Sequence, residues 1–269
     1  MSELRASLWA FRVVLGRDLR VYLSYRSRLF SQALTSVFSL TLFYYVSRLV
    51  HVSGFASPAD YFGFVIVGIA LVGVLYSCFS VAETVRQELV AGTFERLVLS
   101  PFGPVRSVIA MAVFPLLYAF VLAAFTLTLG WLVFGLNLHW STVPLAVPAM
   151  ALALLAFLPF GLAFAALTVV MKQGNVGVSW VIALISIVGG LYFPISLLPE
   201  WVQTATEFQP FTPATEMLRH LLVDSPQTTS ALATIGRVTL FAAVLLPVSI
   251  WTLGRAIRES QRRGTIVEY

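Results

Sequence analysis

Residues 107–171 read SVIAMAVFPLLYAFVLAAFTLTLGWLVFGLNLHWSTVPLAVPAMALALLAFLPFGLAFAALTVVM and contain no Asp, Glu, Lys or Arg. A helix rises about 1.5 Å per residue and the hydrocarbon core of a bilayer is about 30 Å thick, so one span needs about 20 apolar residues. This run is too long for one such helix and suits two. Asn137, His139 and Ser141, followed by Pro144, mark the turn between them. The stretch therefore predicts two consecutive membrane-spanning helices.

The composition of the whole chain indicates an integral membrane protein. Hydrophobic residues make up 59% of the 269 and charged residues only 11%, whereas a soluble domain carries about 25% charged residues. The single cysteine, Cys78, excludes a disulfide framework and a cysteine metal site. The net charge of +5 comes from arginines that flank apolar runs, so we expect lipid phosphates, and not nucleic acid, as the acidic partner.

Apolar runs along the chain predict an all-α membrane domain with six transmembrane helices. The fifth run is interrupted by Gly189-Gly190 and Pro194 before a full span is complete. The predicted spans are residues 29–50, 61–82, 107–134, 144–171, 176–193 and 237–254. The other parts of this single domain, residues 1–269, are an N-terminal interface helix (1–28), a polar elbow (83–106), an outer segment (194–232) and a C-terminal tail (255–269).

The distribution of basic residues predicts the orientation. Cytoplasmic loops of membrane proteins are enriched in Lys and Arg. If six spans leave both termini in the cytoplasm, the outer side holds only Arg48, Arg219 and Arg237. We therefore expect a multi-pass protein of the cytoplasmic membrane with both ends inside. The inner side then holds Arg5, Arg12, Arg17, Arg20, Arg26, Arg28, Arg86, Arg96, Arg106, Lys172, Arg255, Arg258, Arg262 and Arg263.

The N-terminal segment has the pattern of an amphipathic helix. Its apolar residues recur at spacings of three and four, and its arginines lie mostly off that stripe. A basic helix of this kind lies in the plane of the membrane surface. It serves either as an anchor that orients the first span or as a platform that also contacts a cytoplasmic partner. The stripe consists of Leu4, Leu8, Phe11, Leu15, Leu19 and Tyr22.

The elbow begins with ETVRQELVAGTFERLVLSP, residues 83–101. Gly92 can end the preceding helix in the left-handed conformation, and Thr93 is a good N-cap for a new one. Glu95 would lie in the first turn of that helix, where the dipole favours a negative charge. Ser100-Pro101 would stop it. We interpret the pattern as helix, break, short helix and break; the alternative is a solvated loop with ordinary caps.

The chain beyond the interrupted fifth run remains half apolar. Broken backbone at membrane depth is tolerated only when it is buried in protein or lines a wet cavity. We therefore expect short re-entrant helices on the outer side and not a free loop. Glu216 and Arg219 lie three residues apart on one predicted helix, a spacing that allows an ion pair.

Two of these segments resemble ABC-2 type transporter permeases. Residues 88–101 match the pattern E-x-x-x-G-T-x-E-x-L-x-x-S-P that follows the second span in that family. The order of amphipathic helix, six spans and elbow is also similar, so the resemblance covers nearly the whole chain. The outer segment adds the features Gly-Gly, Phe193-Pro194, Leu198-Pro199, Trp201, Pro210 and Glu216-x-x-Arg219.

This resemblance implies the membrane subunit of an ATP-driven exporter, in which the elbow is the coupling helix seated on a nucleotide-binding subunit. The outer segment would form an extracellular gate. The residues implied at the ATPase-subunit contact are Glu83, Arg86, Glu88, Gly92, Thr93, Glu95, Arg96, Ser100 and Pro101. The residues implied in the outer gate are Gly189, Gly190, Phe193, Pro194, Pro199, Trp201, Pro210, Glu216 and Arg219.

The chain has no phosphate-binding loop of its own. The motif G-x-x-x-x-G-K-[ST] is absent, and the one lysine, Lys172, lies in Met-Lys-Gln-Gly. We expect no cofactor in this chain: ATP and Mg²⁺ would bind two copies of a separate ATP-binding subunit. The same resemblance implies a dimer with a second copy or a close paralogue. The translocation path of the substrate would lie between the two copies and would be lined by the first, second and fifth spans.

Aromatic side chains are candidates for the lining of that path. Phe38 and Tyr45 are seven residues apart, and Phe62 and Tyr76 fourteen apart, so each pair shares a helix face. Rings at helical spacing more often face lipid or pack in the core than bind a ligand. If they line a path, sugars and lipid-like drugs both suit them. Members of the family that the chain resembles export polysaccharides, glycolipids, drugs or peptides. We therefore expect a lipid-like, drug-like or glycan substrate.

A secondary transporter and an intramembrane enzyme are the alternatives. An enzyme would need paired acids, or Ser with His, inside the bundle, but His51, His139 and His220 all fall at predicted outer loops. A proton-coupled pump would normally place an acid at mid-membrane, and the predicted spans carry none. Both observations favour an external source of energy.

A charge reversal in the elbow tests the coupling assignment. We expect Glu95→Lys to uncouple ATP hydrolysis from transport, because it reverses the charge presented to the ATPase subunit, and to leave membrane insertion intact. Transport and ATP hydrolysis by the assembled complex measure the effect. Unchanged transport by this variant would remove the assignment.

Overall fold

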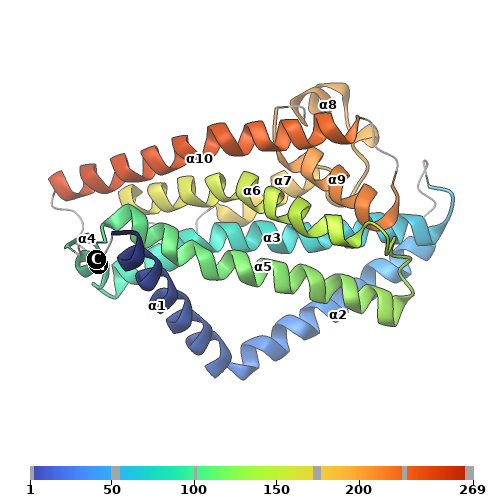
Figure 1. Cartoon of the computed structure of the whole chain (residues 1–269). Helices are drawn as coiled ribbons and strands as arrows, with labels where there is room; N and C mark the ends of the chain where they lie inside the picture. The colour runs from blue at the N-terminus through green and yellow to red at the C-terminus, as the bar shows by residue number, and fades with distance from the viewer. Residues whose placement is uncertain are drawn as a thin grey trace.

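The computed structural model describes residues 3–49, 55–99, 102–171, 177–206, 208–225 and 229–263, and within these ranges it contains helices and loops but no strand. Figure 1 shows the long helices running lengthwise side by side, with the N-terminal helices forming a V against them. The long helices are α3 (Pro58–Val90), α5 (Pro104–Phe134), α6 (Val143–Met171) and α10 (Ala231–Arg262). The V consists of α1 (Glu3–Ser24) and α2 (Arg26–Leu49).

Short helices occupy the two ends of this bundle. At one end, α4 (Phe94–Leu99) follows α3 (Figure 1). Toward the other end lie α8 and α9 (Figure 1). The helices between α6 and α10 are α7 (Val178–Val188), the 3₁₀ turn η1 (Ile195–Leu197), α8 (Glu200–Thr206) and α9 (Phe211–Val223).

Four helices of the described residues, α3, α5, α6 and α10, are long and apolar enough to cross a membrane. Helix α2 is 24 residues long but is rich in Ser and Thr, and it is not among the four. Helix α7 has 11 residues, a length of about 17 Å. An all-α membrane protein is therefore confirmed, whereas the count of six spans stays a prediction.

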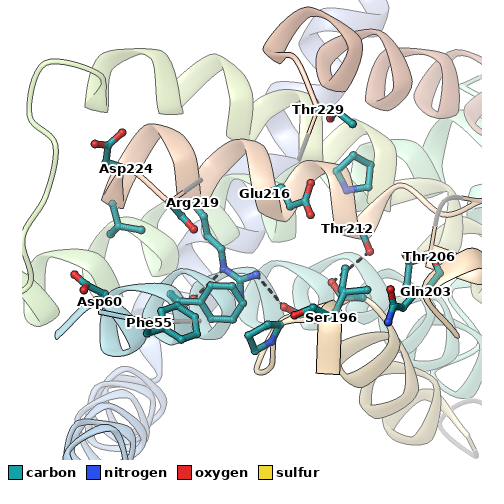
Figure 2. Close-up of a pocket in the computed structure, with 18 of the residues that line it drawn as sticks. Phe55, Asp60, Ser196, Gln203, Thr206, Thr212, Glu216, Arg219, Asp224 and Thr229 are labelled. Carbon is teal, nitrogen blue, oxygen red and sulfur yellow. Dashed lines mark hydrogen bonds between the residues drawn. The ribbon is translucent and has the colours of Figure 1, made fainter. Parts of the chain in front are cut away.

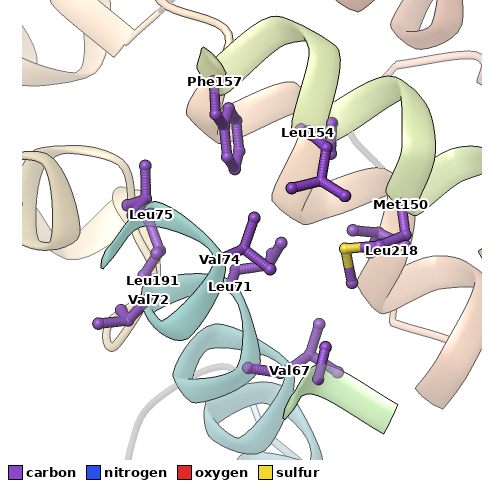
Figure 3. Packing of buried hydrophobic residues seen from close by; sticks show 14 of the residues in the cluster. Val67, Leu71, Val72, Val74, Leu75, Met150, Leu154, Phe157, Leu191 and Leu218 are labelled. Atoms are coloured by element: carbon purple, nitrogen blue, oxygen red, sulfur yellow. The ribbon is translucent and has the colours of Figure 1, made fainter. Parts of the chain in front are cut away.

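Helix α3 is the centre of the bundle. The most apolar 18 residues of α3 are 72% buried, against 17% for α10. Helix α3 packs against α2, α5, α6, α7 and α9. Figure 3 shows its side chains Leu71, Val74 and Leu75 meeting Leu154 and Phe157 of α6. Because protein surrounds it on most sides, a displacement of α3 is felt by every helix that packs on it.

Small residues allow α3 and α6 to approach closely. A Cβ at Gly161 of α6 would lie 2.0 Å from the carbonyl oxygen of Cys78 on α3. Ala153 and Ala165, on the same helix, are fully buried. Glycine and alanine at such contacts let helix backbones pack directly in a membrane, where van der Waals contact replaces the hydrophobic effect as the driving force.

The contact at Gly161 gives a direct test of this packing. We expect Gly161→Ala to destabilise the purified protein by about 1–3 kcal/mol, because the obstructing atom is main chain and cannot rotate away. Thermal unfolding in detergent, followed by size-exclusion chromatography, measures the loss. Gly236→Ala on α10 is the matched control, since a Cβ there meets nothing within 4 Å. Equal melting of the two variants would contradict the packing argument.

Candidate functional site

The polar elbow forms a helix break followed by a short helix. Helix α3 continues to Val90, Ala91 caps it, and Gly92 adopts φ 66°. The amide of Gly92 donates to the carbonyl of Leu89 (3.1 Å), and the amide of Thr93 donates to that of Glu88 (3.0 Å). Helix α4 begins one residue later, with Glu95 in its first turn. The left-handed glycine thus redirects the chain from α3 into α4.

Thr93 uses its hydroxyl differently from the expected N-cap. Its carbonyl accepts the first amides of α4, from Arg96 (3.1 Å) and Leu97 (3.4 Å). Its hydroxyl, however, donates backward to the carbonyl (3.2 Å) and the carboxylate of Glu88. The side chain of Thr93 therefore fastens the start of α4 to the end of α3.

Glu88 also joins the elbow to the N-terminal helix. Arg17 of α1 donates from Nη1 to Oε1 of Glu88 at 3.2 Å, and from Nε to Asp18 at 2.9 Å. The Glu88 side chain is 16% exposed and that of Arg17 is 48% exposed. A half-exposed pair adds little stability, but it fixes the position of α1 relative to the elbow.

An aromatic anchor that sequence reasoning missed holds α4. Phe94 is 1% exposed and packs in a cluster with Val85 and Leu89 of α3 and Val108 of α5. Its signal in the sequence was a lone aromatic residue inside a polar stretch. Arg96, two residues later, is exposed. Helix α4 thus has one face in the core and another turned outward.

Glu83, Arg86 and Gln87 of the elbow form a hydrogen-bonded group on the last turns of α3. Arg86 binds Glu83 through two bonds, Nε to Oε2 at 2.9 Å and Nη2 to Oε1 at 2.7 Å. Gln87 donates to the same carboxylate at 3.3 Å. Ser100 and Pro101, which were implied at the same contact, lie outside the described residues.

At the other end of the bundle, the Gly-Gly pair ends α7. Gly189 caps the helix, and a Cβ there would lie 2.5 Å from the carbonyl of Ile185. Gly190 adopts φ 66°, and a Cβ there would lie 2.6 Å from Ile195. Neither position has room for a side chain, so the turn after α7 requires both glycines.

Arg219 is buried between α9, α3 and this turn. It is 3% exposed. Its guanidinium donates to the carbonyls of Phe64 (3.0 Å), Gly190 (2.9 Å) and Leu191 (2.7 Å), and lies 3.3 Å from the centre of the Phe64 ring. Glu216, one turn earlier on α9, adds a charge attraction. The sequence predicted a Glu216–Arg219 ion pair, but it did not predict these hydrogen bonds from Arg219 to main-chain carbonyls.

Helix α9 is also held by the turn between α5 and α6. The amide of His139 donates to the carbonyl of Leu222 at 2.9 Å, and the hydroxyl of Thr142 donates to that of Leu221 at 2.5 Å. These bonds satisfy carbonyls at the C-terminal end of α9, which has no further turn of helix to supply donors.

Arg219 also lines a cavity of about 780 Å³. Figure 2 shows it extending from α9 toward the region of Phe55 and Ser196, with Glu216 nearby. The lining mixes polar and apolar side chains and comes mainly from α3, the 189–196 turn, α8, α9 and α10. Five implied gate residues line it: Gly189, Gly190, Pro194, Glu216 and Arg219. The other four do not: Phe193 and Trp201 are exposed, Pro199 precedes α8, and Pro210 is buried before α9.

The four aromatic candidates for a path lie in different surroundings. Phe38 and Tyr45 are exposed on α2, and Tyr76 is 51% exposed on α3, most of which is buried. Phe62 is 3% exposed and packs against the rings of Tyr44 and Phe134. Phe62 therefore belongs to the core and does not share the environment of Tyr76.

Tyr76 instead lies with aromatic residues that sequence analysis had not grouped with it. The ring of Phe43 on α2 stacks on that of Tyr192 in the turn after α7, 5.6 Å between centroids and 6° between planes. The phenols of Tyr76 and Tyr192 are close enough to interact electrostatically, and Phe193 packs edge-on to Tyr192. We call Phe43, Tyr76, Tyr192 and Phe193 the aromatic wall. It brings together α2, α3 and the end of α7.

Comparison with known protein families gives a match over most of the chain. A family model described as ABC-2 type transporter matches residues 10–223. Comparison with curated proteins gives no match. Among the residues that the structure describes, no group of three or more His, Cys, Asp or Glu side chains is arranged to hold a metal ion.

Removal of the Phe94 anchor should release α4. We expect Phe94→Ala to cost about 3–5 kcal/mol of local packing, so the amides of residues 94–99 should exchange with solvent much faster while those of α5 and α6 stay protected. Hydrogen exchange with mass spectrometry measures this. Arg96→Ala, at an exposed position of the same helix, serves as the control. Equal exchange of α4 in both variants would show that Phe94 is not its anchor.

Proposed function

Because the chain belongs to the ABC-2 type transporter family, we propose that it is an export permease that moves a lipid-like, drug-like or glycan substrate out across the cytoplasmic membrane. Family membership makes it a multi-pass permease subunit of an ABC transporter that works with an ATP-binding subunit. The outward direction, the class of substrate, the docking of that subunit on the elbow and the pairing of two copies are our proposals.

The observation that carries the proposal is the unbroken length of α3. Its 33 residues correspond to about 50 Å, and the hydrocarbon core is about 30 Å thick. The polar end of α3 must therefore project from the membrane, and α4 is fastened to it by Phe94 and Thr93. A subunit that pushes on α4 acts directly on the central helix of the bundle.

The N-terminal helix supports the elbow. Besides the Arg17–Glu88 bond, Tyr22 of α1 packs against Phe114 and Tyr118 of α5, with centroid distances of 5.5 and 4.8 Å. The C-terminal half of α1 is thus attached both to the bundle and to the elbow. This arrangement favours a platform for a cytoplasmic partner over a simple anchor.

The aromatic wall supports a path beside α2, α3 and α7. Its members carry no charge, and two of them have a phenolic hydroxyl. A surface of this kind suits an amphipathic molecule that offers an apolar body and a few polar groups. Exposed apolar side chains on the neighbouring face of α2, among them Phe38, Leu42 and Tyr45, provide the area against which a second copy packs.

A secondary transporter is the runner-up. It would require a side chain on the path that is charged near neutral pH, and the aromatic wall, which contains two Phe and two Tyr residues, offers none. Movement of cargo by the purified chain under a proton gradient, without nucleotide or an ATPase, would favour it.

Charge reversal at the exposed face of α4 tests the docking site. We expect Arg96→Glu to reduce co-purification with the ATP-binding subunit expressed beside it at least tenfold, because α4 would present the opposite charge to its partner. Pull-down and ATPase rate measure the loss. Arg263→Glu on α10 is the control, since Arg263 is exposed and belongs to another helix, where it pairs with Glu259. Equal recovery of the complex from both variants would rule out docking at α4.

Truncation of the aromatic wall tests the path. We expect Tyr76→Ala to lower transport of a fluorescent amphipathic dye about three- to tenfold, the effect of losing one ring contact with the substrate, while the complex still assembles and hydrolyses ATP. Uptake into inverted vesicles measures it. Trp251→Ala removes a comparably exposed ring from α10 and should have no effect. Equal dye transport by the two variants would remove Tyr76 from the path.

A further inference from the structure

Arg219 joins three separate parts of the chain. It belongs to α9, its Nε donates to the carbonyl of Phe64 on α3, and its two terminal nitrogens donate to Gly190 and Leu191 in the turn after α7. A planar guanidinium with five N–H groups can bind several carbonyls at once, whereas an ammonium is a single point of contact. The two carbonyls of the turn fall just beyond α7, where its amides can no longer reach all of them.

A glycine on α3 completes the contact. A Cβ at Gly68 would lie 1.7 Å from the carbonyl oxygen of Leu191 and 3.1 Å from Nη2 of Arg219. The turn after α7 therefore lies directly on the backbone of α3, where only glycine leaves room for it. We call Arg219, Gly68, Phe64, Gly190 and Leu191 the Arg219 joint.

Helix α3 is suited to carry movement from one end to the other. The other three helices long enough to cross the membrane contain an internal proline: Pro115 in α5, Pro148 and Pro159 in α6, and Pro247 in α10. The one proline of α3, Pro58, is in its first turn. Proline is the usual cause of a kink, so α3 is the stiffest of the four. It has the Arg219 joint near one end and the elbow at the other.

We propose that Arg219 is the positioning residue that makes the turn after α7 move together with α3, so that displacement of the elbow reaches the outer segment. This inference rests on the proposed function, because it assumes that a partner subunit moves the elbow. It adds the residue through which that movement leaves α3. Without Arg219 the elbow and α3 still respond to the partner, but the turn no longer follows.

Spin-label distances in the complete complex, with no need for a known cargo, test the joint. One label replaces Val90 at the end of α3 and a second replaces Leu197 in η1, both exposed positions. Distances between the two copies are measured without nucleotide and after trapping with ATP and vanadate. In the otherwise unchanged protein we expect both distances to shift. In Arg219→Met we expect the Val90 distance to shift as before and the Leu197 distance to stay fixed, with ATP hydrolysis within twofold of normal.

Three further variants separate positioning from folding. Arg219→Lys keeps the charge and some donors, so it should restore part of the Leu197 shift. Gly68→Ala disturbs the same joint from α3 and should give the phenotype of Arg219→Met. Gly63→Ala lies one and a half turns away on α3, its Cβ would meet Val223 at an ordinary 3.4 Å, and it should behave normally.

The outcomes distinguish a failure of the Arg219 joint from a failure of the proposed function. A Leu197 shift of normal size in both Arg219→Met and Gly68→Ala overturns the joint, as does a Leu197 distance that never shifts in the unmodified complex while Val90 does. If Arg219→Met fails to fold, Gly68→Ala and Arg219→Lys decide the matter by the same measurement. A Val90 distance that ignores nucleotide in the unmodified complex refutes the proposed function, and with it the inference.

Discussion

The constraint behind this structure is that main-chain polar groups away from water must find partners within the protein. Long helices meet it without help, and four of them account for most of the bundle. The chain departs from a helix after Gly189, and there Arg219 supplies the missing donors to Gly190 and Leu191. The elbow breaks at Gly92, where Thr93 and Glu88 bind each other and the adjacent backbone. Each break is therefore matched by side chains placed to satisfy it.

Close main-chain packing connects the helices and the turn in which these breaks occur. Gly161 brings α6 against α3 near Cys78, and Gly68 brings the turn after α7 against α3 near Arg219. Both contacts are between main-chain atoms with no side chain between them. Such contacts are stiff, because no rotamer change can absorb a displacement. Helix α3, which leads into the elbow at one end, is thus in direct main-chain contact with α6 and with the turn after α7.

Much of the architecture could be predicted from local patterns. The all-helical membrane fold followed from apolar length, and the family from residues 88–101 and the outer motifs. What could not be predicted are contacts between distant residues. Helical spacing suggested Glu216 as the partner of Arg219, but the carbonyl of Phe64, far away in sequence, is visible only once α3 and α9 are packed. Phe62 and Tyr76 share a face by periodicity, yet one lies in the core and the other on the surface, because different neighbours cover the start and the middle of α3. Phe94 stood out only as a lone aromatic residue in a polar stretch, which does not show where its ring packs.

The shortness of α7 has a consequence for the surrounding lipid. A helix of 11 residues falls well short of the hydrocarbon thickness, and such hydrophobic mismatch is relieved by thinning of the bilayer or by protein that replaces lipid. Either response shortens the apolar distance beside the aromatic wall. A headgroup crossing there would pass through less hydrocarbon than beside the four long helices, and desolvation is the main barrier to its passage.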